Sequence, residues 1–427
     1  MTAIVGVLNK HGVAIAADSA VTFGNTHKVV HTGNKVFALS KFKPVSVATY
    51  GRLSFMGTPW DLIIKLYRQK LGRKSFSTLK EYVQDFIQYL HCKNFYADSL
   101  TQRRYLKENI QEFYDKVEAQ AREEKSFSNE NAAKFIQSRL EECLSLNKIS
   151  TNLCEELINY PFKDFYAFAS NEIEEVINSK LYQLDAEQKS LFAESYFYYL
   201  RQILDTQDTT GLVFSGYGES EIYPSLYSIS ISLGIENRLR YYWRESAEIN
   251  ESGTVASVIP FAQIDVAQTI IRGINPSFYN VLATTFKDSM HGFAAQIAGL
   301  IEPINKDAAN AILGLDTGKV ATEYINKTSE QFRQGYTDPL LNTVVNLDKE
   351  DMSNMAESFV SLTSLVRRMS PMEETVGGPV DVIFISKGDG LIWMKRKHYF
   401  NPDLNAHFFA NYYNDIEDGI IQHMPYI

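Results

Sequence analysis

Short apolar runs near both ends of the chain predict β-strands. Each run is shorter than an ordinary helix and is bounded by turn-forming or charged residues. The runs cover residues 2–7, 12–17, 35–39, 212–217, 225–233 and 238–243. A last pair, 380–386 and 391–396, flanks the turn Lys387-Gly388-Asp389-Gly390 and predicts a hairpin close to the end of the chain.

Helical spacing replaces this pattern from about residue 60 to 207. One face of a predicted helix is lined by Leu79, Tyr82, Val83, Phe86, Ile87 and Leu90. Pro260 is expected to precede a second helix that reaches Arg272 and stops at Gly273. A last amphipathic helix is predicted to end at Ser370-Pro371. Strands interrupted by a helical block predict an α+β protein with a helical insertion at 60–206.

Composition narrows the classes of function. The chain has 427 residues, 45% of them hydrophobic, so it can bury a large core. A formal charge of −9 argues against a nucleic-acid surface. We find no secretory signal and no run of about 18 apolar residues, so we expect a cytoplasmic protein that does not enter a membrane. Three cysteines without a Cys-x-x-Cys pair indicate neither disulfides nor a metal site, and no cofactor is expected.

Candidate chemistry lies at the start of the chain. Thr2 opens the first strand, Asp18 ends the second, and Lys35 opens the third. A threonine hydroxyl is a weak nucleophile that needs a base within hydrogen-bond reach. If Met1 is removed, the α-amine of Thr2 supplies that base, since its reference pKa is roughly 7.7–8.0 and a nearby cation would lower it. Lys35 is the candidate cation, and Asp18 the anion that fixes it.

Spacing adds to this pattern. Asp18 follows Thr2 by sixteen residues, Ala20-Val21-Thr22 comes next, and Lys35-Val36-Phe37-Ala38-Leu39 completes the block. Two later blocks accompany it, at 210–229 and at Val376-Gly377-Gly378-Pro379-Val380-Asp381-Val382. Together they resemble the proteasome β-type peptidases, a branch of the N-terminal nucleophile (Ntn) hydrolases. On this resemblance the chain is identified as a large bacterial-type homologue with a helical insertion.

The resemblance implies roles for individual residues. Thr2 would be nucleophile and base, with Asp18 and Lys35 as its tuning pair, and Thr22 would bind substrate backbone. The oxyanion donor would be the N–H of Thr49 or Gly51, because the two sequences slip by two residues there. A supporting Asp and Ser are replaced by Glu373 and Val376 ahead of Gly377, which leaves Glu373 and Gly377 as weaker candidates. The family's Gly-Ser-Gly turn would fall at residues 259–263, where no serine stands, although Ser257 is close in sequence.

The resemblance also implies an architecture: a four-layer αββα sandwich of two antiparallel sheets. Its core would span residues 1–59 and 207–400, with the insertion at 60–206 and a tail at 401–427. The composition of the insertion does not distinguish a lid, a substrate-selecting wall and an assembly surface. No ATPase motif is present, so energy-dependent unfolding would require a separate ATPase or regulatory partner. We expect a homo-oligomer.

Three functions remain open at this point. The first is a threonine-type peptidase that acts on peptide or protein substrates. The second is an amidohydrolase of a small molecule that uses the same residues. The third is a non-catalytic subunit in which Thr2 stays blocked.

Overall fold

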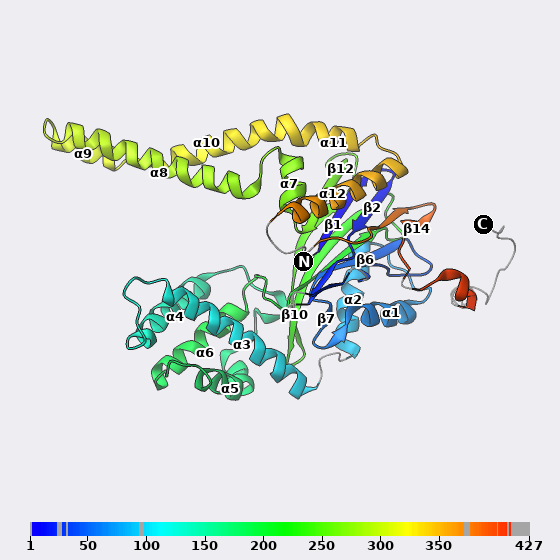
Figure 1. The fold of residues 1–427 in the computed structure, drawn as a ribbon, viewed down its shortest axis with the longest axis horizontal. Coiled ribbons are helices and arrows are strands. Elements are labelled where there is room, and N and C mark those ends of the chain that lie inside the picture. Colours follow the sequence, from blue (N-terminus) through cyan, green and yellow to red (C-terminus); the bar gives the residue numbers. More distant parts are fainter. Residues whose placement is uncertain are drawn as a thin grey trace.

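The computed structural model describes residues 2–23, 28–30, 33–93, 98–370, 376–398, 400–407 and 410. Two five-stranded sheets form its centre (Figure 1), and every pairing within them is antiparallel. The first sheet has the order β12-β1-β2-β13-β14 and the second β11-β10-β9-β6-β5. The predicted combination of helices with two antiparallel sheets is therefore confirmed.

Eight strands of the two sheets coincide with the predicted apolar runs, whereas β6 and β12 were not predicted. In the first sheet they are β1 (Ala3–Asn9), β2 (Gly12–Ala17), β12 (Ala256–Ala262), β13 (Asp381–Ser386) and β14 (Gly390–Lys395). In the second they are β5 (Val36–Ala38), β6 (Val45–Gly51), β9 (Thr210–Gly216), β10 (Ser225–Ile235) and β11 (Arg238–Glu248). Two small hairpins are made by β3 (Val21–Phe23) with β4 (Lys28–Val30) and by β7 (Ser54–Phe55) with β8 (Thr58–Pro59).

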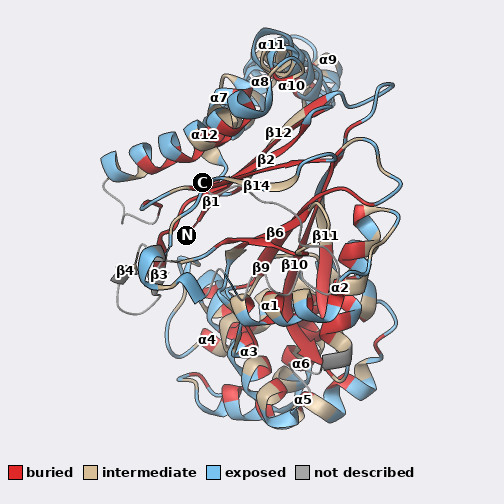
Figure 2. Ribbon diagram, turned by 90° about the vertical axis from the view of Figure 1, so that its right-hand side faces the viewer, coloured by how far each residue is buried: buried red, intermediate tan, exposed pale blue. Residues whose placement is uncertain are grey.

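Strand β1 shows why these runs are apolar throughout. Its side chains alternate between two cores, because successive residues of a strand point to opposite faces of the sheet. Ile4 and Leu8 join the cluster between the two sheets, which also contains Val213 and Leu226 of the second sheet. Ala3, Val5 and Val7 instead pack on the other face, beneath helix α12 (Lys349–Met369). A strand buried on both faces has no polar side, as Figure 2 shows for the central strands.

The prediction for Pro260 was wrong. Pro260 lies within strand β12, where it pairs with Val5, and helix α7 (Asp265–Arg272) begins only at Asp265. β12 is the edge strand of its sheet. A proline is tolerated there because its missing N–H faces outward rather than into a neighbouring strand.

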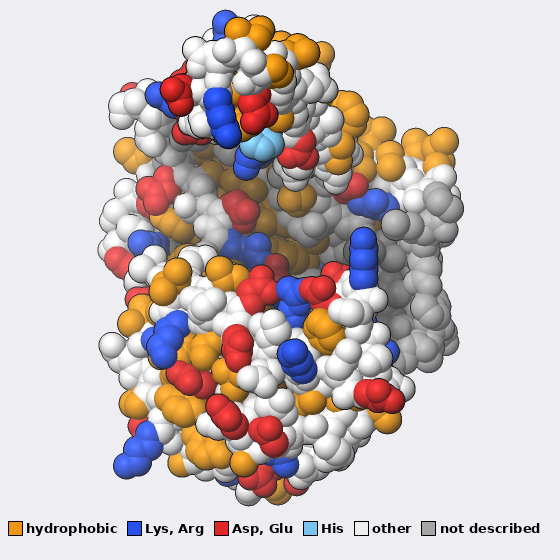
Figure 3. All heavy atoms as spheres, turned by 90° about the vertical axis from the view of Figure 1, so that its left-hand side faces the viewer, with side chains coloured by type: hydrophobic (Ala, Val, Ile, Leu, Met, Phe, Trp, Pro, Cys, Tyr) orange, Lys and Arg blue, Asp and Glu red, His pale blue; other side chains and the backbone are white. Residues whose placement is uncertain are grey.

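A long helical arm separates α7 from α12. It consists of α8 (Pro276–Ile301), α9 (Lys306–Leu313) and α10 (Thr317–Phe332), and it returns to the sheets through the π-helical turn Arg333–Thr337 and α11 (Asp338–Val344). Figure 1 shows α8 and α10 running side by side away from the sheets, with α9 at the far end. Figure 3 views the arm from that end and shows the surface hollowed between it and a second group of helices below. The range 207–400, predicted as core, thus contains this projection.

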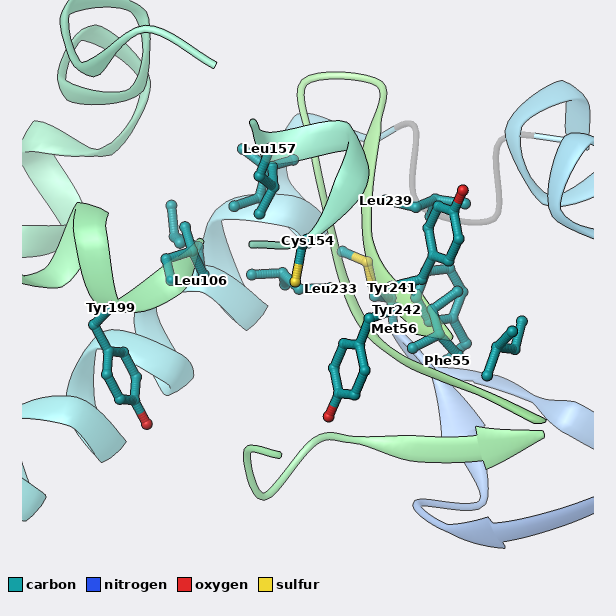
Figure 4. Packing of buried hydrophobic residues seen from close by; sticks show 14 of the residues in the cluster. Phe55, Met56, Leu106, Cys154, Leu157, Tyr199, Leu233, Leu239, Tyr241 and Tyr242 are labelled. Atoms are coloured by element: carbon teal, nitrogen blue, oxygen red, sulfur yellow. The ribbon is translucent and has the colours of Figure 1, made fainter. Parts of the chain in front are cut away.

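That second group is the predicted helical block. Its elements are α1 (Trp60–Leu71), α2 (Leu79–Lys93), α3 (Ser99–Arg122), α4 (Ala132–Ile149), the 3₁₀ turn Glu155–Leu157, α5 (Phe162–Asn178) and α6 (Ala186–Leu200). Helix α2 contacts β9 and β10, and α3 contacts β10. The block shares one continuous apolar cluster with the second sheet, part of which Figure 4 shows around Cys154, Leu233 and Tyr241. The boundaries at 60 and 206 remain predictions.

Candidate active site

The candidate residues come together at one end of the first sheet. Because β1 and β2 are antiparallel, the start of β1 lies beside the end of β2, and Ala17 also pairs with Asp381 at the start of β13. On the other side of β1, Ala3 pairs with Ala262 at the end of β12. Four strand ends therefore meet where the sequence places Thr2 and Asp18.

Asp18 is the centre of a saturated hydrogen-bond network. Its Oδ1 accepts from the N–H of Ala3 at 2.9 Å and from Lys35 Nζ at 2.7 Å. Its Oδ2 accepts from the N–H groups of Ala20 and Gly377, both at 3.1 Å. The residue is 1% exposed. These four donors hold the carboxylate in one orientation.

Lys35 is equally buried, at 1% exposure. It immediately precedes β5, and its backbone oxygen accepts from the N–H of Thr49 at 2.8 Å. Burial lowers the pKa of the Lys35 ammonium below its ordinary value, the Asp18 carboxylate opposes that shift, and the charge of Lys397 adds to it. Because the surroundings are buried, the Lys35 ammonium interacts strongly with charges on neighbouring groups.

Thr2 is fixed by its backbone on both sides. Its carbonyl oxygen accepts from the N–H of Gln263 at 3.2 Å, while the next amide, that of Ala3, donates to Asp18. Thr2 is 6% exposed. The amide that follows Thr2 and the Lys35 ammonium thus bond to the same carboxylate oxygen. The structure brings Thr2, Asp18, Lys35 and Gly377 together.

The substrate-binding candidates differ in what their backbone can offer. In β6, Thr49 is buried and its N–H already bonds to Lys35. Gly51 ends the same strand with φ +84°. Alternate residues of a strand point their N–H groups to the same side, so the N–H of Gly51, like that of Thr49, points toward β5. Thr49 therefore has its N–H engaged by Lys35, and the oxyanion role of Gly51 remains a prediction. Thr22 lies in β3, but its side chain and all of Glu373 lie outside the described residues.

Two residues at this site escaped the sequence analysis. Gln263 contacts Thr2 through its N–H, and its side-chain oxygen accepts from Arg367 Nε. Arg367, in the last turn of α12, also forms an ion pair with Asp265. Gln263 belongs to the turn where the resemblance expects a serine. Ser257 does not replace that serine, because it pairs with Leu8 at the opposite end of β1.

A second, partly buried ion pair lies nearby. Lys397 forms it with Asp381, and the Lys397 N–H also donates to that carboxylate at 2.8 Å. Asp381 pairs with Ala17, the residue before Asp18, and this places Lys397 near enough for its charge to act on Lys35. Nothing in the spacing of the sequence pointed to this pair.

The described residues contain no group of three or more His, Cys, Asp or Glu side chains arranged to hold a metal ion. In the same residues, none of the helices has the length and apolarity needed to cross a membrane. Cys154 is buried, and burial raises the pKa of its thiol, so it is a packing residue of the helical block.

Comparison with known proteins found no matching family model and no matching curated protein sequence. Solved structures similar to this chain include Anbu (ancestral beta-subunit) from Yersinia bercovieri, with 8% identity, a TM-score of 0.28 and coverage of 99% of this chain and 100% of that one. They also include Anbu from Hyphomicrobium sp. strain MC1, with 8% identity, a TM-score of 0.29 and coverage of 99% and 100%. A third is the helical assembly of the Anbu complex from Pseudomonas aeruginosa, with 9% identity, a TM-score of 0.30 and coverage of 99% and 98%.

These findings correct the identification of the chain as a large bacterial-type homologue of the proteasome β-type peptidases. The structures found are Anbu proteins, and no family model supports the assignment. The resemblance rested on three short blocks, whereas most of the remaining length forms the helical block and the arm.

Proposed function

We propose that this chain is an N-terminal threonine hydrolase that cleaves peptide or amide bonds after removal of Met1. The observation that carries the proposal is the buried Asp18–Lys35 pair, whose carboxylate bonds directly to the amide that follows Thr2. A buried ion pair costs desolvation free energy and is weak evidence of a stabilising role. Its position beside Thr2 instead supports a role in tuning the threonine amine.

The reaction follows from the groups present. The free α-amine of Thr2 takes the proton from Oγ as that oxygen attacks the carbonyl carbon of the substrate. The Lys35 cation favours the neutral amine before attack. The Gly51 N–H donates to the oxyanion of the tetrahedral intermediate. The resulting ammonium then protonates the leaving nitrogen, the C–N bond breaks, and water hydrolyses the ester on Oγ by the same steps.

The fold of this hydrolase would be the four-layer Ntn sandwich, with residues 1–59 and 207–400 as its core. Three apolar clusters support this arrangement: one between the sheets, one under α7 and α12, and one under the helical block. Within that scheme α1 and α2 would be the helical layer on the second sheet, and α3–α6 the addition. A peptide or unfolded protein is the favoured substrate, with a separate ATPase or regulatory partner for folded ones.

Two other functions use the same residues and predict different results. A small-molecule amidohydrolase would label at Thr2 but leave peptide amides intact. A non-catalytic subunit would retain Met1 and would neither label nor turn over substrate. Lys35 is buried and its pKa is lowered. Ionisable groups perturbed in this way are concentrated at functional sites, which favours a catalytic chain over a non-catalytic subunit.

The test compares Thr2→Ala, Thr2→Ser and Ser257→Ala on a panel of peptide amides with a fluorogenic leaving group. Thr2→Ala should abolish turnover, and Thr2→Ser should keep part of it because the hydroxyl and the amine remain. Ser257→Ala is the matched control, since this hydroxyl lies at the far end of β1, and it should have wild-type activity. Full activity in Thr2→Ala would place the reaction elsewhere.

A further inference from the structure

The helical arm buries almost none of its own surface. Among the described side chains of α8, α9 and α10, one in each helix is buried: Ala298, Ala309 and Ala321. Figure 2 shows the arm as mostly exposed or intermediate residues, in contrast to the helices that cover the sheets. The two long helices are joined by the stacked rings of Phe286 and Tyr324, 4.1 Å apart, but an isolated pair of helices cannot enclose a core.

Large apolar side chains lie along this exposed surface. Phe278, Leu282, Phe293 and Leu300 of α8 follow one another at intervals of 4, 11 and 7 residues, which at about 100° per residue places them within roughly 60° of arc. We call this group, together with its exposed neighbours on α8 and α10, the arm stripe. Its members are 39% to 76% exposed: Phe278, Val281, Leu282, Phe293, Leu300, Val320 and Tyr324.

The size of the arm stripe is that of a protein interface. At about 150–200 Å² for each fully exposed large side chain, its exposed area comes to roughly 700 Å². A stable complex buries about 800 Å² on each partner. Monomeric soluble proteins rarely leave a contiguous apolar patch of this extent uncovered unless it binds something.

The charges of the arm argue against a lipid surface as the occupant. Residues 276–332 contain four lysines and no arginine, against six acidic residues, and α8 has only Lys287 and Asp288 as charged residues. Helices that lie on anionic membranes are rich in Lys and Arg beside their apolar face. Figure 3 shows hydrophobic atoms gathered on one flank of the arm, with only scattered charges around them.

We propose that the arm stripe is an interface between two copies of this chain. A hairpin of two long helices with an apolar stripe beside its seam is half of an antiparallel four-helix bundle, and a second identical hairpin completes it. Twofold pairing needs only a self-complementary patch, so no other partner is required. The pairing joins two molecules through their arms.

The experiment measures the mass of the full-length protein in solution by light scattering at micromolar concentration. Phe293→Glu combined with Leu300→Glu should lower the mass twofold, because the carboxylates would be buried in the paired arms. Leu146→Glu combined with Ile149→Glu is the matched control, since both residues are exposed on α4, and it should keep the wild-type mass. Circular dichroism should show all variants folded, because every substituted side chain is exposed.

Mixing separates arm-to-arm pairing from docking of the arm elsewhere. A Phe293→Lys, Leu300→Lys variant should also have the lower mass alone, and mixing it with the Glu variant should restore the wild-type mass through opposite charges. A wild-type protein that is monomeric, a Glu variant of unchanged mass, or a mixture that stays dissociated would each overturn the proposal. Binding of the wild type to vesicles of phosphatidylglycerol, lost in the Glu variant, would assign the stripe to lipid instead.

Discussion

Replacing Lys35 by methionine should destabilise the protein far more than removing a surface lysine does. The change leaves the Asp18 carboxylate buried without its counter-ion. Removing one partner of a buried pair costs about 3–5 kcal/mol in free energy of unfolding. Asp18 keeps the N–H groups of Ala3, Ala20 and Gly377 as donors, which places the expected loss at the lower end, about 3 kcal/mol.

The matched control is Lys107→Met. Lys107 forms an ion pair with Glu175 in which both side chains are about half exposed, and such a pair contributes less than about 1 kcal/mol. Urea unfolding followed by circular dichroism gives both values. A double variant, Lys35→Met with Asp18→Asn, should lose less than the two single losses together, because the residues are in contact. Equal stabilities of Lys35→Met and Lys107→Met would refute the buried pair.

Three further predictions concern the surroundings of this pair. Gly51→Ala should lower the free energy of unfolding by about 1–3 kcal/mol, because φ is +84° and the new Cβ would lie 2.4 Å from the Thr209 oxygen. The control Gly388→Ala has open space around the new Cβ and should be neutral. Equal melting temperatures of the two variants would contradict this prediction. Gln263→Ala should lower kcat roughly tenfold to a hundredfold with little change in KM. The substitution keeps the backbone N–H that bonds to Thr2 but removes the side-chain oxygen that accepts from Arg367, and this loosens the segment that positions Thr2. The exposed substitution Arg333→Gln should leave kcat unchanged. Folding lowers the pKa of Lys35, so the unfolded chain binds the lysine proton more tightly than the folded chain does. The free energy of unfolding of the wild type should therefore rise relative to that of Lys35→Met as the pH increases toward 10.5. A fall of the wild-type stability relative to Lys35→Met over this range would contradict the direction of the pKa shift.

The sequence was most informative where burial is complete. The strands β1, β2 and β13 are apolar on both faces, so short uninterrupted runs identified them without an alternating pattern. Thr2, Asp18 and Lys35 could be selected because each stands at the end of such a run, and antiparallel pairing then brings run ends together.

Contacts made between distant segments could not be predicted this way. Arg367 reaches Gln263 across 104 positions, and neither residue type is unusual in its local sequence. Pro260 was misread because a proline ahead of an apolar stretch is typical of a helix start, whereas only the sheet order shows that β12 is an edge strand. The sequence also did not reveal that a helical arm projects between α7 and α12, because periodicity does not show what covers an apolar face.

The central claim is that Thr2, freed of Met1, is the covalent nucleophile. The most direct measurement treats the full-length protein with an electrophilic probe for N-terminal threonine and records intact mass and a peptide map. We predict a protein lighter by one methionine that gains one probe adduct, mapped to Thr2 and absent in Thr2→Ala. A protein that retains Met1, or an adduct that maps to another residue and persists in Thr2→Ala, would contradict the claim.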